Sequence, residues 1–364
     1  MKIAIISSAN IMHMTLINHY LKLINLENHE LDIIYMDKYN MDEEIKVSNK
    51  FKYFVDIKPN DNKFIKLNKY LTFRKYVNKI VNKKDYDLYI IWNSYTAQLL
   101  GPRFFSKIKN KYILNIRDYT YENNKIIYYR MKYFIEQSIF TTVSSDGFKS
   151  FLPKSEKIIM LHSINEDIVN ISNNFVDNNL KIEKPINISF IGNVRFYKEN
   201  KRLISVFAND ERFILNYHGV GYEPLKKYCD DEKIMNVNFT GRFEPKNTIS
   251  FLNDADVINN YYGKNSIALT TAISIRLYYA VALWKPILVT PDTYTSTIAT
   301  KLGIGFSKEI NKNYADELYF WINSEKFRNE VVNREKFLVK VTRDNELFRE
   351  KFLRVLKNEH KKIN

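Results

Sequence analysis

Cysteine is almost missing from this sequence of 364 residues, which contains Cys229 and no other. One thiol cannot form an internal disulfide or a zinc site of several thiolates, so we expect a protein of a reducing compartment. Glycine and proline are also scarce, at 9 and 8 residues, which excludes collagen-like and low-complexity chains. No stretch has the roughly 18 uncharged apolar residues that cross a bilayer. The short apolar run Met1–Ser8 is typical of a buried strand and not of a signal peptide, so the expected location is the cytoplasm.

What the sequence does contain is enough apolar material for two globular domains. Hydrophobic residues make up 45% of the chain, aromatic residues 15% and charged residues 27%. The net charge is +15, and it is spread evenly: residues 1–184 hold 28 basic and 20 acidic residues, and the remainder holds 28 and 21. Neither half is therefore a dedicated basic module of the kind that binds nucleic acid.

The segment 63–84 is the one strongly basic stretch, because it has eight lysines and arginines and no acidic residue. Apolar residues recur in it at helical spacing, which predicts a basic amphipathic helix. Two interpretations stay open: an ordinary domain helix with a lysine-rich solvent face, or a peripheral contact with an anionic membrane leaflet. No helix-turn-helix, zinc or stacking-platform pattern accompanies it, so we expect no nucleic-acid partner. The apolar positions are Phe64, Leu67, Leu71, Val77, Ile80 and Val81.

Strand-like apolar runs alternate with helical patterns along the whole chain, which predicts α/β architecture with parallel sheets. In the first half, expected strands include Lys2–Ser7, Leu88–Trp92 and Tyr112–Ile116, with a helix over Met12–Leu26. After an Asn/Asp-rich stretch near 165–185, the alternation starts again at residue 187. We therefore predict two Rossmann-like domains at 1–168 and 187–342, a linker at 169–186 and a C-terminal helix at 343–364. Two such domains are expected to face each other across a cleft.

Candidate ligand-binding residues follow the expected strands of the second half, because open α/β sheets bind ligands at the carboxyl ends of their strands. Gly192 and Asn193 form a turn that is followed by Arg195 and Lys198, and a glycine turn with nearby cations can hold a phosphate. Gly219 follows the next strand. Gly241, Arg242 and Phe243 follow the third, where the arginine and the ring could lie against a base. Taken singly, each of these turns could equally be an ordinary solvated loop.

A longer polar segment, residues 259–280, supplies the remaining candidates of that half. Ser274 is expected to cap a helix whose first turn contains Arg276 and Leu277, so that free backbone N–H groups could receive a diphosphate. Tyr261 lies in the preceding loop and is a further candidate contact.

An ordered series of segments resembles bacterial glycosyltransferases of the GT-B fold, closest to the retaining family 4 type that builds capsule, O-antigen and other surface glycans. Phe190–Lys198 is similar to the family's phosphate motif, with Lys198 at the place of its lysine and Arg195 standing in for its arginine. The resemblance covers roughly residues 1–310. The other similar segments are Asn28–Ile34, Thr142–Ser145, Leu161–Asn165, Asn236–Arg242, Ala255–Val257 and Lys285–Ile287.

The resemblance has one departure, because the family's pair of donor-binding glutamates would fall on Thr271 and Tyr279. The segment is instead similar to an Asn-Lys-Leu-Tyr-Glu variant of other polysaccharide transferases, with Arg276 at the place of the lysine. The resemblance implies that no metal or cofactor is needed, since protein cations would stabilise the leaving diphosphate. It also implies a catalytic residue after a central strand of the first domain. Asp118 is the leading candidate there, ahead of His13, and an Arg117–Asp118 structural pair is the alternative.

Together these observations predict a transferase that moves a hexose or N-acetylhexosamine from a nucleotide-diphosphate sugar, most simply a UDP-sugar, to a lipid-linked or surface-polysaccharide acceptor. The alternative is a non-catalytic GT-B subunit that stabilises or tethers a partner transferase. An Asp-x-Asp pattern at Asp254 and Asp256 is expected to be structural and not a metal site, because it lies where a helix enters a buried strand.

Overall fold

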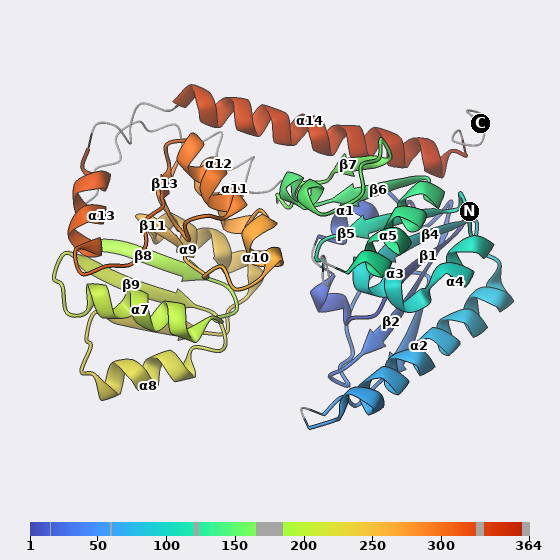
Figure 1. The fold of residues 1–364 in the computed structure, drawn as a ribbon, viewed down its shortest axis with the longest axis horizontal. Helices are drawn as coiled ribbons and strands as arrows, with labels where there is room; N and C mark the ends of the chain where they lie inside the picture. Colours follow the sequence, from blue (N-terminus) through green and yellow to red (C-terminus); the bar gives the residue numbers. More distant parts are fainter. Residues whose placement is uncertain (15, 59, 120–123, 165–184, 325–330, 359–364) are drawn as a thin grey trace. The chain divides into compact units, whose positions relative to one another are not determined.

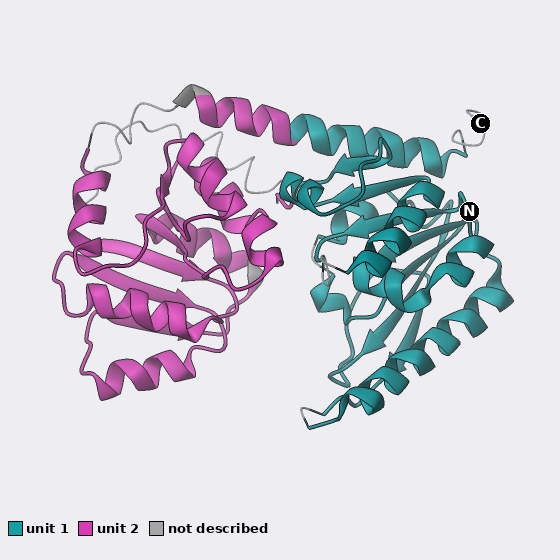
Figure 2. Cartoon of the chain, viewed as in Figure 1, with its two compact units in different colours: residues 1–162, 342–364 teal, residues 163–341 magenta. Residues whose placement is uncertain are grey.

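The structure is a computed structural model that describes residues 1–364 except 15, 59, 120–123, 165–184, 325–330 and 359–364. The chain divides into two compact units (Figure 2). Unit 1 contains residues 1–162 and 342–364, and unit 2 contains residues 163–341. Most of the predicted linker at 169–186 lies outside the described residues.

Unit 1 is built on a parallel sheet of seven strands in the order β3-β2-β1-β4-β5-β6-β7 (Figure 1). Its central strands are nearly continuous apolar runs because both faces of the sheet are covered. Ile3 and Ile5 of β1 point into one core cluster, and Ile6 is equally buried. The strands are β1 (Lys2–Ser7), β2 (Glu30–Asp37), β3 (Asn49–Phe54), β4 (Leu88–Trp92), β5 (Tyr112–Ile116), β6 (Phe140–Val143) and β7 (Ile158–Met160). The helices between them are α1 (Asn18–Leu21), α2 (Lys63–Lys84), α3 (Ser94–Leu100), α4 (Pro102–Lys107) and α5 (Lys125–Gln137), with 3₁₀ turns at Ile11–His13 and Asp146–Ser150.

Unit 2 repeats the design with a six-stranded parallel sheet in the order β10-β9-β8-β11-β12-β13. Successive residues of β8 enter different core clusters: Phe190 packs with α7, α8 and α13, whereas Ile191 packs with α9, α11 and α12. Helices therefore cover both faces. The strands are β8 (Ile186–Ile191), β9 (Phe213–His218), β10 (Val237–Gly241), β11 (Val257–Asn260), β12 (Ile287–Val289) and β13 (Gly305–Phe306). The helices are α7 (Tyr197–Phe207), α8 (Glu223–Asp231), α9 (Thr248–Asp254), α10 (Ile267–Thr271), α11 (Ile275–Ala282), α12 (Tyr294–Lys301) and α13 (Tyr314–Ile322), with a 3₁₀ turn at Pro245–Asn247.

In both sheets the strand order is that of a doubly wound Rossmann fold, so the predicted fold class is confirmed for each unit. The predicted helix 63–84 is also confirmed with the same bounds. Its apolar positions divide, however: Phe73, Val77 and Ile80 are buried, while Phe64 is 82% exposed and Leu67 is 54% exposed.

The last helix, α14 (Val331–Leu356), differs from the prediction because it begins well before residue 343. Its first part belongs to unit 2, where the Phe337 ring stacks on Tyr278. Its second part belongs to unit 1, where Phe348 and Phe352 pack edge-on against the buried ring of Tyr20. One helix therefore contributes side chains to the cores of both units.

The predicted helix over Met12–Leu26 is wrong for most of its length. The chain forms a 3₁₀ turn at Ile11–His13 and a helix of only four residues, α1. Leu16 lies between them with a positive φ of 61°, which interrupts a right-handed helix. The backbone N–H groups of Ile11 and Met12 donate to the carboxylate of Glu43, a contact between distant residues that no local pattern indicates.

Candidate functional site

The strand order of unit 2 reverses between β8 and β11, and this switch point is where doubly wound sheets bind ligands. The loops that follow β8, β9 and β11 carry most of the predicted residues. Unit 2 therefore has a candidate site at the carboxyl edge of its sheet, formed by these loops and by the start of α11.

Glycines allow the loops after β8 and β9 to pack closely. The backbone N–H of Gly192 donates to the carbonyl of His218 at 2.8 Å. Gly219 has a φ of +140°, and a Cβ there would lie 1.9 Å from the carbonyl oxygen of Gly192. No other residue fits that position without moving the backbone, so Gly219 sets the close approach of the two loops.

Arg276 lies beneath these loops and is the most unusual side chain of the site. It is 6% exposed, its guanidinium donates to the carbonyl of Ile191, and it lies 4.1 Å from the centroid of the Phe190 ring and 5.1 Å from that of Tyr262. Among the residues that the structure describes, no carboxylate forms an ion pair with it. Burial, with a smaller contribution from the nearby charge of Arg195, lowers the pKa of Arg276 to about 9.

Two helix N-termini approach the same loops. Ser274 caps α11 as predicted: its hydroxyl accepts from the backbone N–H of Arg276 at 3.3 Å and donates to Asn260 at 2.6 Å. By contrast α7 begins after Phe196, which has a φ of 58°, and no side chain caps it. Its first N–H groups are therefore available to an anion. Arg195 and Lys198, which flank this helix start, are exposed.

The loop after β11 is held by side chains that the sequence did not single out. The hydroxyl of Thr290 accepts from the backbone N–H groups of Tyr262 and Gly263, each at 3.0 Å. Glu199 of α7 lies against Gly263 and accepts from the side chain of Asn265 at 3.3 Å. A carboxylate thus lies near the site, although Thr271 and Tyr279 provide none.

Three further candidates have buried or structural positions. Tyr261 is 2% exposed and its hydroxyl donates to Glu309 at 3.4 Å. Leu277 is fully buried in the core that α11 forms with the sheet. Gly241 is buried and bridges to Gly219. Their predicted roles as ligand contacts remain predictions.

The loop after β10 presents Arg242 to solvent and holds Phe243 half-buried against Phe251, 5.1 Å between ring centroids. The imidazole of His218 stacks on Phe251, with 3.9 Å between ring centroids. Asn193 is exposed in the loop after β8. The roles of Arg242, Phe243 and Asn193 as ligand contacts remain predictions.

In unit 1, Asp118 is exposed directly after β5, and its backbone carbonyl accepts a hydrogen bond from Ser94 at 2.8 Å. His13 is also exposed and lies 3.1 Å from the hydroxyl of Tyr39. Both follow the carboxyl ends of parallel strands, as predicted.

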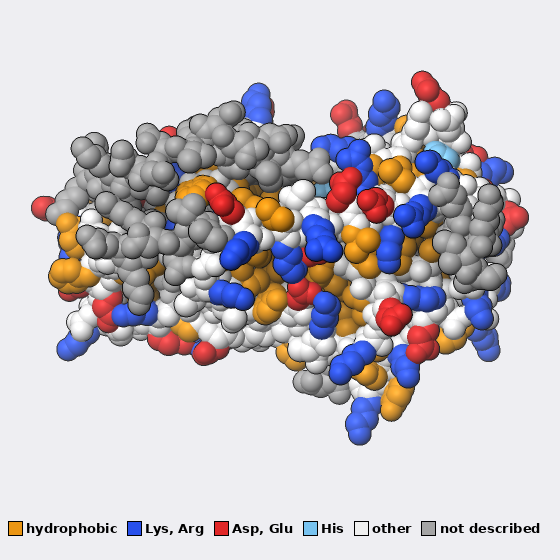
Figure 3. All heavy atoms as spheres, turned by 90° about the horizontal axis from the view of Figure 1, so that it is seen from above, with side chains coloured by type: hydrophobic (Ala, Val, Ile, Leu, Met, Phe, Trp, Pro, Cys, Tyr) orange, Lys and Arg blue, Asp and Glu red, His pale blue; other side chains and the backbone are white. Residues whose placement is uncertain are grey.

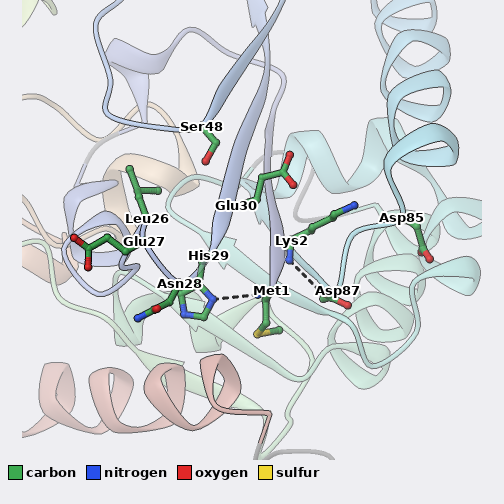
Figure 4. Close-up of a pocket in the computed structure, with 10 residues that line it drawn as sticks. All are labelled: Met1, Lys2, Leu26, Glu27, Asn28, His29, Glu30, Ser48, Asp85 and Asp87. Atoms are coloured by element: carbon green, nitrogen blue, oxygen red, sulfur yellow. Dashed lines mark hydrogen bonds between the residues drawn. The ribbon is translucent and has the colours of Figure 1, made fainter.

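A polar hollow lies at the opposite, amino edge of the unit 1 sheet (Figure 4). Met1 and Lys2 line it, together with Asp87, which accepts from the backbone N–H of Lys2 at 2.8 Å. The terminal amine of Met1 lies 3.3 Å from the imidazole of His29. These groups form hydrogen bonds with one another, and the hollow lies at the edge of the sheet away from Asp118. We therefore do not assign the acceptor-side site to this hollow.

Asp256 has a structural contact, since its carboxylate accepts from the backbone N–H of Asn187 at 2.7 Å. Within the described part of the chain, no group of three or more His, Cys, Asp and Glu side chains is arranged to hold a metal ion. Cys229 is buried, and burial raises the pKa of its thiol to about 11, so it is a poor nucleophile.

The unit 2 arrangement favours binding of a compact anion such as a diphosphate. Within the described residues, a buried guanidinium without an acidic partner, a helix start without a side-chain cap and two exposed cations all supply positive potential at one edge of a sheet. The sequence identified Arg276, Arg195 and Lys198. It did not identify Phe190 and Tyr262 as the two rings that contact the guanidinium of Arg276.

No protein-family model matches the chain, and no curated protein matches it. Solved structures do. HepE from Anabaena, in complex with UDP, aligns with a TM-score of 0.64 at 11% identity, covering 96% of this chain and 99% of the other. WaaG, a glycosyltransferase involved in lipopolysaccharide biosynthesis, gives 0.62 at 11% identity and covers 97% and 99%. A UDP-GlcNAc 2-epimerase from Neisseria meningitidis, bound to UDP-GlcNAc, gives 0.57 at 13% identity and covers 94% and 100%. The chain therefore has the two-domain GT-B fold, as its sequence resemblance implies.

Proposed function

We propose that this GT-B chain is a glycosyltransferase that takes a sugar from a nucleotide-diphosphate donor, a UDP-sugar in the simplest case. The observation that carries the proposal is Arg276: a buried guanidinium without an acidic partner in the described chain, at the switch point of the unit 2 sheet. A structure with UDP and one with UDP-GlcNAc are among those with the same fold, which supports the choice of base.

Each group has a distinct part in this proposal. Glycosyl transfer breaks the bond between the anomeric carbon and the diphosphate oxygen and forms a bond from that carbon to the acceptor oxygen, so negative charge develops on the departing diphosphate. Arg195 and Lys198, with the N–H groups at the start of α7, would stabilise that charge, which is commonly the largest electrostatic contribution in such sites. Arg276 would bind the diphosphate at the carboxyl end of β8, and Ser274 would orient the first turn of α11.

On the acceptor side, the proposed role of Asp118 is that of a base that accepts the proton of the acceptor hydroxyl, or of a contact with the acceptor sugar. A lipid-linked or surface-polysaccharide acceptor is proposed on the resemblance to surface-glycan transferases, and WaaG supports that class. Peripheral membrane contact through 63–84 belongs to the same proposal. Within the described residues, no helix is long and apolar enough to span a bilayer. Capsule or O-antigen synthesis and metal independence remain parts of the proposal.

The alternative is a non-catalytic subunit of the same fold that stabilises a partner transferase, and Thr271 and Tyr279 in place of glutamates favour it. The exposed cations Arg195 and Lys198 argue against it, because a scaffold has no need of phosphate-directed cations.

A thermal-shift series with UDP, GDP, CMP and dTDP distinguishes the two functions. A ligand that binds only the folded state raises the midpoint by mass action. We expect one nucleoside diphosphate to raise it in the wild type and not in Arg276→Met, while the exposed arginine variant Arg202→Met, on α7, retains the response. A folded wild type that responds to none of them would favour the non-catalytic subunit.

A further inference from the structure

Unit 1 contains a second candidate site, a largely apolar pocket of about 280 Å³ between α2, α3 and α5. Leu71 of α2, Leu99 of α3 and Met131 of α5 supply apolar walls, and the ring of Tyr70 lies 5.3 Å from that of Tyr95 at one side. The volume is close to the lower end of that of small-molecule sites, which begin at about 300 Å³.

Two arginines face this apolar pocket from different helices. Arg74 of α2 and Arg130 of α5 both line it. Both guanidinium groups lie close to Gly101, because a Cβ at that position would be 3.5 Å from a terminal nitrogen of each. Arg130 donates to the carbonyl of Gln98 at 2.6 Å. Within the described residues, neither guanidinium forms an ion pair with a carboxylate, and the Nε atom of Arg130 is buried without a partner.

Two like charges this close are unfavourable without an anion between them. Burial and the neighbouring charge of Arg74 lower the pKa of Arg130, so both effects disfavour its charged form. A phosphate is the ligand that relieves such a pair, because guanidinium groups bind its oxygens through parallel hydrogen bonds.

Exposed apolar side chains adjoin the pocket-lining residues of α2 and α5, which indicates that the ligand continues into an apolar phase. Leu67 lines the pocket and is 54% exposed, and Phe64 precedes it on α2 by about one turn. Ile126 and Tyr129, also exposed, are the chain neighbours of the lining residues Ile127 and Arg130. Soluble surfaces rarely gather such side chains beside a pocket without a partner. Lys63 and Lys125, at the starts of these two helices, are exposed and add positive charge for an anionic surface.

The pocket also reaches the edge of the sheet that carries Asp118. Ser94, which lines the pocket, donates to the backbone carbonyl of Asp118 at 2.8 Å, and Tyr119 is both a wall of the pocket and the next residue in the chain. The arginine pair lies by Gly101, at the other end of α3 from Ser94, so a ligand held here would extend along α3 toward the sheet edge that carries Asp118.

We propose that this pocket binds a phosphate attached directly to the end of a membrane-embedded prenyl chain, with Arg74 and Arg130 holding the phosphate and the helix ends Phe64–Leu67 and Ile126–Tyr129 contacting the chain. This inference rests on the proposed function in one respect: the lipid is then the carrier of the acceptor sugar. The binding step itself needs no donor and no chemistry.

Co-sedimentation of the full chain with vesicles tests the proposal. One set of phosphatidylcholine vesicles contains a polyprenyl phosphate, and the other contains phosphatidylglycerol at matched charge. We expect the wild type to bind the first set roughly tenfold more tightly, because the two guanidinium groups would form charge-assisted hydrogen bonds to its phosphate. Arg74→Gln and the double variant Arg74→Gln/Arg130→Gln should lose that preference. Arg103→Gln, an exposed arginine on α4 with the same charge change, should keep it.

Several outcomes would overturn the inference. Equal binding of the wild type to both vesicle sets would reduce the effect to surface charge, and retention of the preference in Arg74→Gln, whose side chain makes no described hydrogen bond, would exclude the arginine pair. Complete competition by millimolar inorganic phosphate would assign the pocket to free phosphate. The UDP thermal shift is measured on the same samples, so loss of nucleotide binding and loss of lipid preference identify failure of the proposed function and of this inference separately.

Discussion

Replacing Arg276 by methionine should stabilise unit 2 while removing its response to nucleotide. Burial lowers the pKa of Arg276 to about 9. Because one pKa unit corresponds to about 1.4 kcal/mol, holding this side chain charged at pH 7 costs the folded state on the order of 5 kcal/mol. This cost is the net value, because the aromatic contacts with Phe190 and Tyr262 and the bond to the carbonyl of Ile191 already favour the charged form within it.

Methionine removes the charge and keeps a contact with the rings, because sulfur packs favourably on aromatic groups by about 0.3–1.5 kcal/mol. We therefore expect Arg276→Met to be more stable than the wild type by at least about 1 kcal/mol, with a rise in the apo midpoint of about 2–4 °C for each kcal/mol in a unit of this size. The wild type should gain about 2.7 kcal/mol at a nucleotide concentration of 100 times Kd, and the variant should gain nothing.

The sign of the pH dependence gives an independent check. The folded-state pKa of Arg276 lies below its unfolded value, so the penalty is fully present below pH 9 and is relieved as pH rises through and above 9. The advantage of Arg276→Met should therefore be seen at pH 7 and should shrink at pH 10. Differential scanning fluorimetry at both pH values, with Arg202→Met as the control, measures it. A variant that is clearly less stable than the wild type at pH 7 but still responds to UDP would show that Arg276 serves the fold and not a ligand.

Three further changes are predicted from the packing. Phe348→Ala empties a fully enclosed position of the unit 1 core and should lower the free energy of unfolding by about 3–5 kcal/mol in a denaturant titration; a loss below about 1 kcal/mol would mean that α14 contributes little to that core. Gly219→Ala places a Cβ 1.9 Å from the carbonyl oxygen of Gly192 and should both lower the thermal midpoint and weaken the UDP response, and an unchanged response would separate this turn from the site. Lys198→Ala should weaken UDP binding by about tenfold at low salt. Lys201→Ala, about one turn further along α7 and over the ring of Tyr228, should leave UDP binding unchanged. Equal losses of UDP affinity in a titration of the two variants would exclude a specific phosphate contact by Lys198.

The sequence predicts the sheets well because their central strands are buried on both faces. Runs such as Leu88–Trp92 and Ile186–Ile191 need no tertiary information to be recognised as parallel strands. The edge strand β3 is not predicted, because its residues are only exposed or half-buried and its lysines interrupt the apolar run that would indicate a strand. The short helices α3 and α4 escape because Gly101 and Pro102 separate them after one or two turns.

Around the candidate site, local sequence patterns predict local structure, whereas contacts between distant residues are not predicted. Ser274 is a cap by its local sequence, and the structure confirms it. Nothing local indicates that Arg276 turns under the sheet edge to contact Ile191, or that Arg74 and Arg130 face one pocket. Charge shows the same limit: on the face drawn in Figure 3, basic, acidic and apolar side chains are interspersed, so composition alone does not locate a binding surface.

The helix α14 has a consequence for synthesis on the ribosome. Unit 1 contains the first 162 residues, yet its core needs Phe348 and Phe352, and the imidazole of His162 lies 2.9 Å from the carboxylate of Asp344. The residues of unit 2 are translated in between. The core of unit 1 therefore cannot be completed until α14 has left the exit tunnel, and Tyr20 and its neighbours stay uncovered until then. The sheet of unit 2 can form earlier. The N-terminal half of this protein is expected to finish folding last.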